Sequence, residues 1–150
     1  MAAVDTDVLI VGGGPTGGML ALELARNNIS FRIIDSAASR SDKSRAVVVH
    51  PRSLELVNRH GLAEEFIRRG RYNSAVKLFS QKAFIFKLEF KEMVQRDSAF
   101  PGPLMLSQAD TEDIFDEALA KYGGKKVERP VTLSRMEQDE NGVLYVYQSL

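Results

Sequence analysis

The chain has 150 residues, of which 44% are hydrophobic, which is enough for one globular domain with a buried core. Its 20 basic and 20 acidic residues give a formal net charge of zero, so composition favours neither nucleic acid nor an anionic membrane as a partner. The absence of cysteine excludes disulfides and thiolate metal sites, and no apolar run approaches the roughly 20 residues that span a bilayer. The N-terminus lacks the pattern of a secretory signal, so we expect a cytoplasmic protein.

The first strongly patterned stretch contains two apolar runs. Residues 8–11 form an unbroken run of branched apolar side chains, which is typical of a parallel strand that is covered on both faces, and residues 29–34 predict a second strand. A helix is predicted between them, beginning near Pro15 and ending at Asn27. Its apolar stripe is predicted to consist of Leu20, Ala21, Leu24 and Ala25.

The turn between the first strand and this helix is rich in glycine. Gly12, Gly14 and Gly17 match GxGxxG, in which the glycines permit a tight turn, close approach of a pyrophosphate and close packing of the helix on the strand. Asp35 ends the second strand roughly 20 residues later, where a carboxylate can accept hydrogen bonds from a ribose diol. The glycines alone also fit an ordinary strand-to-helix turn, but the whole arrangement predicts dinucleotide binding. The motif does not distinguish NAD from FAD.

The next segment is predicted to be a loop followed by two short helices. Residues 36–44 are small and polar, and Arg45 follows them. Arg45 is either a solvated loop residue or a residue that binds a phosphate through its planar guanidinium. The helices are predicted at residues 51–59 and 62–69.

The hydrophobic period then changes from helical to alternating. Residues 75–79 and 84–90 are rich in apolar and aromatic side chains and predict a β-hairpin with one strongly apolar face. One interpretation is that this face lines a ligand cavity. Packing under a sheet or on another domain is the favoured interpretation, because apolar strand faces usually belong to a core.

A further helix is predicted after Ser107, which is placed to cap it with Asp110. Gln108 lies in its first turn. Its side-chain amide could contact a cofactor there, but an exposed helix start explains the position equally well. The predicted buried stripe consists of Ile114, Phe115, Ala118, Leu119 and Tyr122.

The C-terminal part is predicted to be extended. Residues 125–129 form a short extended segment, and residues 131–136 and 143–147 form a hairpin. No third parallel strand is evident, which suggests an incomplete α/β domain. His50 and His60 lack metal-ligand spacing and no GxSxG is present, so the sequence identifies neither a metal site nor catalytic residues.

Several segments together resemble one protein family. They are DVLIVGGGPTG, Asp35, SRAVVVHPRSLELVNRHGL around Arg45, and PLMLSQADTEDIF around Gln108. This combination resembles the N-terminal part of the flavin-dependent aromatic hydroxylases, the single-component FAD monooxygenases of the phenol and para-hydroxybenzoate hydroxylase type. The resemblance implies a Rossmann-like βαβ FAD-binding fold with an added β-hairpin region. Residues 1–150 would be the N-terminal portion of the FAD-binding domain, with about 75–103 beginning the substrate-domain sheet.

The resemblance also implies roles for the matching positions. Asp35 would hold the adenosine ribose, and Arg45 would reach the FAD phosphates or ribityl chain. Gln108 would bond the cofactor from its helix start, and Val131 would offer backbone to the adenine. The pyrophosphate loop would consist of Gly12, Gly13, Gly14, Thr16 and Gly17.

Members of that family hydroxylate an aromatic ring with NAD(P)H and dioxygen, so a small aromatic substrate is implied for a full-length enzyme. Later DG and GD motifs of the family do not occur in residues 1–150, and we expect this chain alone to be inactive. An alternative is a non-catalytic nucleotide-binding or interaction module, whose hairpin is covered by a second copy or by a missing C-terminal portion. An NAD-dependent oxidoreductase shares the glycine motif, but it leaves Arg45 and Gln108 unexplained.

Overall fold

The computed structural model divides the chain into two compact units. One unit comprises Met1–Asp42 with Glu112–Leu150, and the other comprises Lys43–Thr111. The residues that the structure describes are 6–40, 48–72, 75–90, 97–123, 125–140 and 142–149.

The first unit is built on a parallel pair of strands. β1 (Val8–Val11) and β2 (Phe31–Ile34) pair along their whole length, and α1 (Pro15–Arg26) connects them. This βαβ-type connection is the one that the sequence predicted, although β2 begins two residues later than the predicted strand at 29–34. Ile29 lies outside the strand and is 41% exposed.

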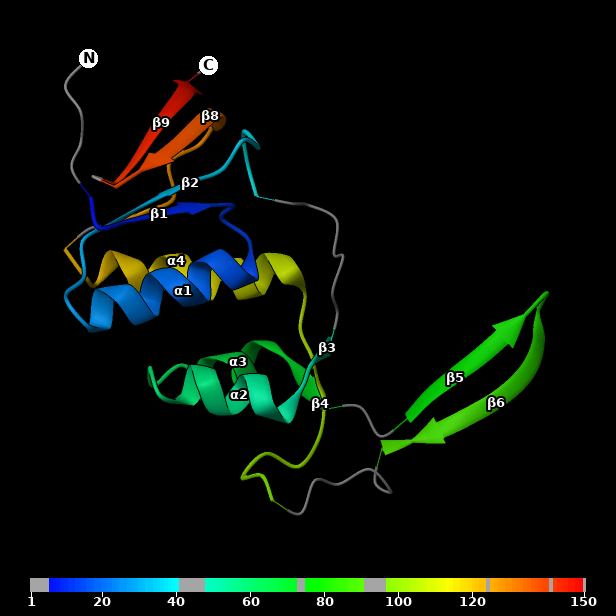
Figure 1. Cartoon of the computed structure of the whole chain (residues 1–150). Coiled ribbons are helices and arrows are strands. Elements are labelled where there is room, and N and C mark those ends of the chain that lie inside the picture. Colours follow the sequence, from blue (N-terminus) through cyan, green and yellow to red (C-terminus); the bar gives the residue numbers. More distant parts are fainter. Residues whose placement is uncertain are drawn as a thin grey trace. The chain divides into compact units, whose positions relative to one another are not determined.

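A third chain segment lies beside β2 through one isolated bridge, which agrees with the extended segment predicted at 125–129 and adds no third strand to the described β1–β2 sheet. Glu128 forms a parallel bridge to Ile34, with its N–H donating to Ile33 O at 3.0 Å. The segment leads directly into the antiparallel hairpin of β8 (Val131–Asp139) and β9 (Gly142–Ser149). Figure 1 shows α1 on one side of β1 and β2 and this hairpin on the other. A single bridge is too short to produce a recognisable strand pattern in the sequence.

The buried face of α1 differs from the predicted stripe. Gly18, Ala21 and Leu22 are buried, whereas Leu20 is 44% exposed. A Cβ on Gly18 would lie 2.8 Å from a ring carbon of Phe115, so the small size of Gly18 lets that ring pack against the helix. A hydrophobic pattern does not count glycine as apolar, so it did not identify Gly18 as part of the buried face. The predicted stripe was therefore wrong at Leu20.

The helix α4 (Gln108–Ala120) contributes to both units, because the division falls between Thr111 and Glu112. Ser107 caps it, since its Oγ accepts from Asp110 N at 3.0 Å, as predicted. Tyr122 follows the helix end and is 39% exposed, so its place in the buried stripe was wrong. The buried stripe was correct at Ile114, Phe115, Ala118 and Leu119.

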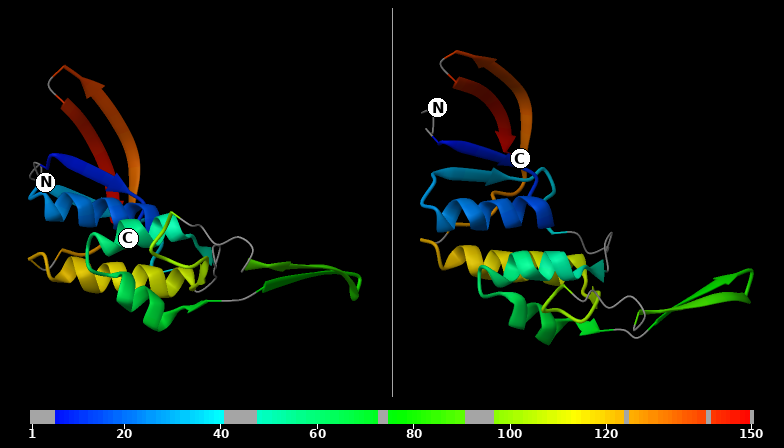
Figure 2. Two further views of the ribbon diagram at one scale, coloured as in Figure 1. Left: turned by 90° about the horizontal axis from the view of Figure 1, so that it is seen from below. Right: turned by 60° about the horizontal axis from the view of Figure 1, so that its bottom comes forward.

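The second unit contains two helices and a small sheet. The helices α2 (Pro51–Asn58) and α3 (Ala63–Arg69) agree with the predicted ones, and Figure 2 shows them packed together. The antiparallel sheet has the order β3 (Val48–Val49), β7 (Leu104–Met105) and β4 (Arg71–Tyr72), which are too short to be evident from sequence. Its buried apolar side chains are Leu54, Val57, Leu62, Ala63, Phe66, Phe100, Leu104 and Leu106.

The second unit also contains the predicted aromatic hairpin. β5 (Ala75–Ser80) and β6 (Ala83–Glu89) pair with each other and, within the described residues, with no other strand. Phe79 and Phe84 pack edge to face with ring centroids 5.7 Å apart, yet they are 56% and 57% exposed. Ile85, on the opposite face, is 52% exposed. Both faces of this hairpin are therefore exposed, and the predicted packing of one face is not seen in the described part of the chain.

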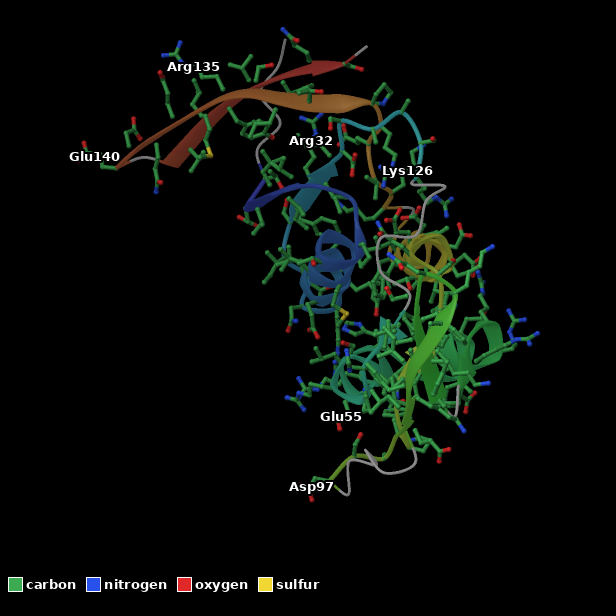
Figure 3. All side chains as sticks on the ribbon, turned by 90° about the vertical axis from the view of Figure 1, so that its right-hand side faces the viewer. Arg32, Glu55, Asp97, Lys126, Arg135 and Glu140 are labelled. Atoms are coloured by element: carbon green, nitrogen blue, oxygen red, sulfur yellow. The ribbon has the colours of Figure 1, made fainter. Side chains whose placement is uncertain are left out.

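The hairpin of β8 and β9 is joined to β2 by a partly buried arginine. Arg32 donates from Nε and Nη2 to the two carboxylate oxygens of Glu128, both at 2.7 Å, and its guanidinium lies 4.0 Å from the ring centroid of Tyr147. The hydrogen bonds to Glu128 raise the pKa of Arg32. Figure 3 shows Arg32 between β2 and the hairpin, whereas Arg135 lies farther out along the hairpin.

Candidate cofactor site

In the glycine turn after β1, the backbone of the turn and the backbone of α1 lie closer together than a side chain would allow. Gly12 has φ of 112° and donates its N–H to Ile34 O at 2.8 Å. A Cβ on Gly17 would lie 1.9 Å from Gly12 O, so α1 can approach the turn only with glycine there. Gly14 differs, because the nearest atom to its Cβ position is Glu112 Oε1 at 3.9 Å. Gly14 therefore leaves open space at the start of α1.

The first turn of α1 has the features of an anion-binding helix end. Gly14 is the N-cap residue and Pro15 begins the helix, so one of the amides that a helix leaves unpaired is absent. Within the described residues no side chain caps this end, and the first turn contains no acidic residue. The remaining amide hydrogens and the positive end of the helix dipole suit a phosphate group. Thr16 lies in this turn and is exposed.

Asp35 connects this turn to the end of β2. Its Oδ2 accepts from Gly13 N at 2.7 Å and lies 3.1 Å from Arg129 Nη1, while Oδ1 accepts from Ala37 N at 2.8 Å. An ionised carboxylate has about four acceptor positions, so about one remains for a further donor such as a ribose hydroxyl. The predicted ribose acceptor thus lies directly beside the glycine turn.

Arg129 belongs to this site although the sequence did not single it out. Its Nη2 donates to Gly13 O at 3.0 Å and lies 4.0 Å from Glu112 Oε2. The Arg129 side chain is only 13% exposed, and Glu112 is buried. A Cβ on Gly13 would lie 2.7 Å from Nη2, so a glycine there makes room for the guanidinium. Neither charged residue had a sequence signal, because each is far along the chain from the turn that it contacts.

A second ionic cluster ties the loop after β2 to α4. Arg40 pairs with Asp113, and its Nε lies 3.5 Å from Asp116 Oδ2. Burial raises the pKa of Asp116, while the positive charges of Arg40 and Arg129 oppose that rise. These ion pairs connect the loop that follows Asp35 to the middle of α4.

The other predicted site residues have different outcomes. Arg45 lies outside the described residues, and Gln108 belongs to the second unit. Val131 donates its backbone N–H to Asp35 O at 2.8 Å, which places the start of β8 next to the acid. Within the first unit the structure brings together Gly12, Gly13, Gly14, Gly17, Asp35 and Val131, and adds Arg129 and Glu112.

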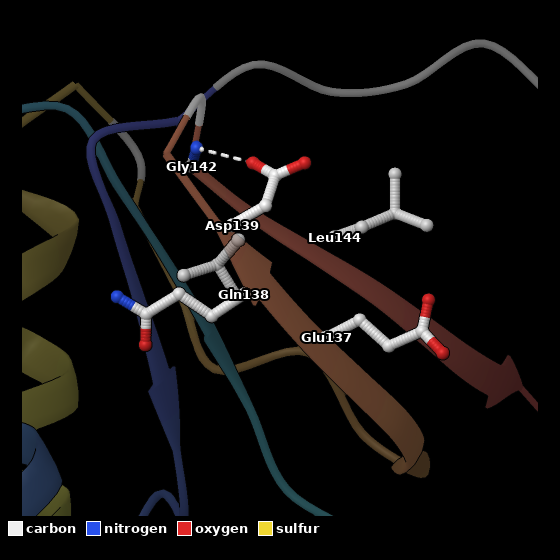
Figure 4. Close-up of a pocket in the computed structure, with 6 residues that line it drawn as sticks. Glu137, Gln138, Asp139, Gly142 and Leu144 are labelled. Carbon is white, nitrogen blue, oxygen red and sulfur yellow. Dashed lines mark hydrogen bonds between the residues drawn. The ribbon is translucent and has the colours of Figure 1, made fainter.

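A separate hollow lies at the tip of the β8–β9 hairpin (Figure 4). Its only drawn interaction is the hydrogen bond from Gly142 N to Asp139 Oδ1 at 3.1 Å. Its lining residues are Glu137, Gln138, Asp139, Gly142, Val143 and Leu144, all from one hairpin. The glycine turn contributes nothing to it, so we assign it no part in cofactor binding.

The described ranges contain neither a metal-binding cluster nor a membrane-spanning helix. Among those residues no group of three or more histidine and acidic side chains is arranged to hold a metal ion. None of the helices described has the combination of length and apolar character that crossing a membrane requires.

Comparisons with known proteins agree with the geometry. The model of the FAD binding domain family matches residues 5–149. The 6-methylpretetramide 4-monooxygenase of Streptomyces rimosus is 40% identical over 118 residues, which cover 77% of this chain and 21% of that protein. The pentachlorophenol 4-monooxygenase of Sphingobium chlorophenolicum is 32% identical over 142 residues, covering 94% of this chain and 26% of that protein. The chain thus spans only a minor part of these relatives.

Solved structures show the same fold. Aklavinone-11 hydroxylase in a ternary complex with FAD and aklavinone matches with a TM-score of 0.82 and 25% identity, over 99% of this chain and 30% of that one. The flavin-dependent monooxygenase PieE, solved with FAD and substrate, matches with a TM-score of 0.86 and 21% identity, over 98% of this chain and 27% of that one. The predicted Rossmann-like fold and the predicted cofactor, FAD, are confirmed, and the chain belongs to the FAD binding domain family.

Proposed function

We propose that this chain binds the ADP half of FAD within a flavin-dependent monooxygenase that hydroxylates a phenolic or polyketide-like aromatic ring with NAD(P)H and dioxygen. The observation that carries the proposal is the direct hydrogen bond from Gly13 N to Asp35 Oδ2 at 2.7 Å. It places a ribose acceptor beside an uncapped helix start that suits pyrophosphate, as an ADP moiety requires.

The residues of the first unit fit that cofactor. Gly14, with open space at its Cβ position, would let the pyrophosphate approach the backbone, and Asp35 has about one acceptor position for a ribose hydroxyl. Val131 would bring backbone to the adenine side of the acid, and Arg45 and Gln108 would complete contacts farther along the cofactor. When bound, FAD supplies the redox chemistry of hydroxylation, while the protein holds and shields it.

We further propose that hydroxylation needs protein beyond this chain. The relatives are far longer, since the chain covers 21% and 26% of the two monooxygenases described above. Residues 75–103 would then contribute to the substrate domain of the longer enzyme. NADPH-dependent hydroxylation by the isolated chain would contradict this part of the proposal.

The test is a binding titration of the full 150-residue chain with FAD, ADP, FMN and NAD in parallel. Flavin fluorescence and equilibrium dialysis would measure the dissociation constants. We expect FAD and ADP to bind, FMN to bind more weakly because it lacks the adenosine half, and Asp35→Ala to weaken FAD and ADP at least tenfold. Asp97→Ala, at an exposed acid of the second unit, is the matched control. Preference for NAD over FAD would refute the proposed cofactor.

A second candidate function rests on the exposed β5–β6 hairpin. Phe79, Phe84 and Ile85 are each more than half exposed, an arrangement that favours a protein contact. A non-catalytic interaction module would use this surface to pair two copies or to bind another chain. Sedimentation of the purified chain would separate the two functions: dimerisation lost on Phe84→Ser, together with absence of FAD binding, would favour the interaction module.

A further inference from the structure

Arg129 is a largely covered cation that connects the two ends of the glycine fingerprint. Nη1 lies 3.1 Å from Asp35 Oδ2, and Nη2 donates to Gly13 O at 3.0 Å. One guanidinium thus holds the acid at the end of β2 and the carbonyl in the turn after β1. The planar guanidinium reaches the two oxygens with separate donor arms in a fixed geometry, which the single nitrogen of a lysine ammonium does not provide.

This arrangement fixes the orientation of the Asp35 carboxylate. Gly13 N–H and Arg129 Nη1 approach Oδ2, while Ala37 N–H binds Oδ1. Donors on both oxygens restrain rotation of the carboxylate, so its remaining acceptor position has a defined direction. A group that is held in its binding orientation before a ligand arrives loses less conformational freedom on binding.

Arg129 also balances negative charge at the turn. The Glu112 carboxylate, whose side chain is 5% exposed, lies 4.0 Å from Nη2. The attraction between Glu112 and the guanidinium acts at short range, where screening by solvent is weak, and it helps to hold Arg129 in place beside Asp35.

We propose that Arg129 is a positioning residue of the ADP site, which holds the Asp35 carboxylate in the orientation that accepts a ribose hydroxyl. The inference rests on the proposed function, because it concerns the same site. Its main action is through Asp35, so its effect on affinity depends on a ligand that has ribose hydroxyls.

The test compares ADP with 2′,3′-dideoxy-ADP, which lacks both hydroxyls, by isothermal titration calorimetry on the full chain. We expect Arg129→Met to weaken the binding of ADP about tenfold, which is the loss typical of a disrupted charge-assisted hydrogen bond. The affinity for dideoxy-ADP should change less than twofold. In an Asp35→Ala background, Arg129→Met should change ADP affinity less than twofold. The matched control is Arg135→Met, because Arg135 is 72% exposed and pairs with Glu137 on the hairpin.

The outcomes distinguish this inference from the proposed function. If the wild-type chain binds neither FAD nor ADP, the proposed function and this inference fail together. If the wild-type chain binds ADP but Arg129→Met weakens the binding of ADP and dideoxy-ADP equally, or weakens the binding of neither, only the positioning role is refuted. Should Arg129→Met lose its cooperative thermal transition, Arg129→Lys replaces it, with an expected loss of at least threefold for ADP alone; an equal loss for dideoxy-ADP would refute the role.

Discussion

Replacing Gly17 by alanine should destabilise the first unit strongly. The new Cβ would lie 1.9 Å from Gly12 O and 3.1 Å from its carbonyl carbon, whereas real Cβ contacts are essentially never under 3.0 Å. The obstacle is backbone, so the turn and α1 must separate by more than an ångström. Overpacking typically costs about 1–3 kcal/mol, and we expect about 3 kcal/mol here. For a chain of this size that corresponds to a fall in Tm of roughly 6–12 °C.

The comparison with Gly14→Ala separates packing from ligand approach. The Cβ of that variant would meet only Glu112 Oε1 at 3.9 Å, so we expect its free energy of unfolding to stay within about 1 kcal/mol of the wild type. Its ADP affinity should nevertheless fall at least tenfold, because the methyl group would occupy the approach of the pyrophosphate.

Thermal unfolding followed by circular dichroism measures the stabilities, and calorimetric titration measures the affinities. Gly102→Ala is the control for the general effect of replacing a glycine, because no atom lies within 4 Å of its Cβ position. A Gly17→Ala variant that melts at the wild-type temperature would show that the close approach of helix and turn does not constrain this residue.

Two further predictions concern charged side chains. Arg32→Met should lower the free energy of unfolding in urea by about 1–3 kcal/mol, because it removes both hydrogen bonds to Glu128, and Arg32→Lys should not restore the loss since an ammonium lacks the fork. Arg52→Met, which removes a 73% exposed side chain from its ion pair with Glu55, should lower it by less than about 0.5 kcal/mol, and equal losses would contradict the reasoning. Hydrogen bonds from Arg68, and to a smaller extent from Arg69, lower the pKa of Glu65 from 4.5 to about 2. Any stability that they add is therefore present above pH 4.5 and is lost as the pH falls toward 2. An NMR titration should find the Glu65 midpoint near 2 and a higher midpoint in Arg68→Met, and an unchanged midpoint would exclude the Arg68 hydrogen bond as a cause.

Local patterns were sufficient to predict much of this fold. The unbroken apolar run of β1, the glycine turn and the helical spacing after it depend on interactions between residues close in sequence, so the sequence predicted them correctly. The cap at Ser107 and the hairpins follow from equally local chemistry. The choice of FAD over NAD did not follow from the glycine motif, and depended on resemblance over most of the chain.

What the sequence by itself determined was therefore the fingerprint: the turn at Gly12 to Gly17, and the acid Asp35 at the end of the next strand. The tertiary structure alone decided what surrounds that fingerprint. It placed Glu128 beside β2 and brought Arg129 and Glu112 to the turn from distant positions. It also selected the face of α1 that contains Gly18, because Phe115 packs there. Such contacts join residues that are far apart in the chain, and no local periodicity records which distant side chain will fill a given space.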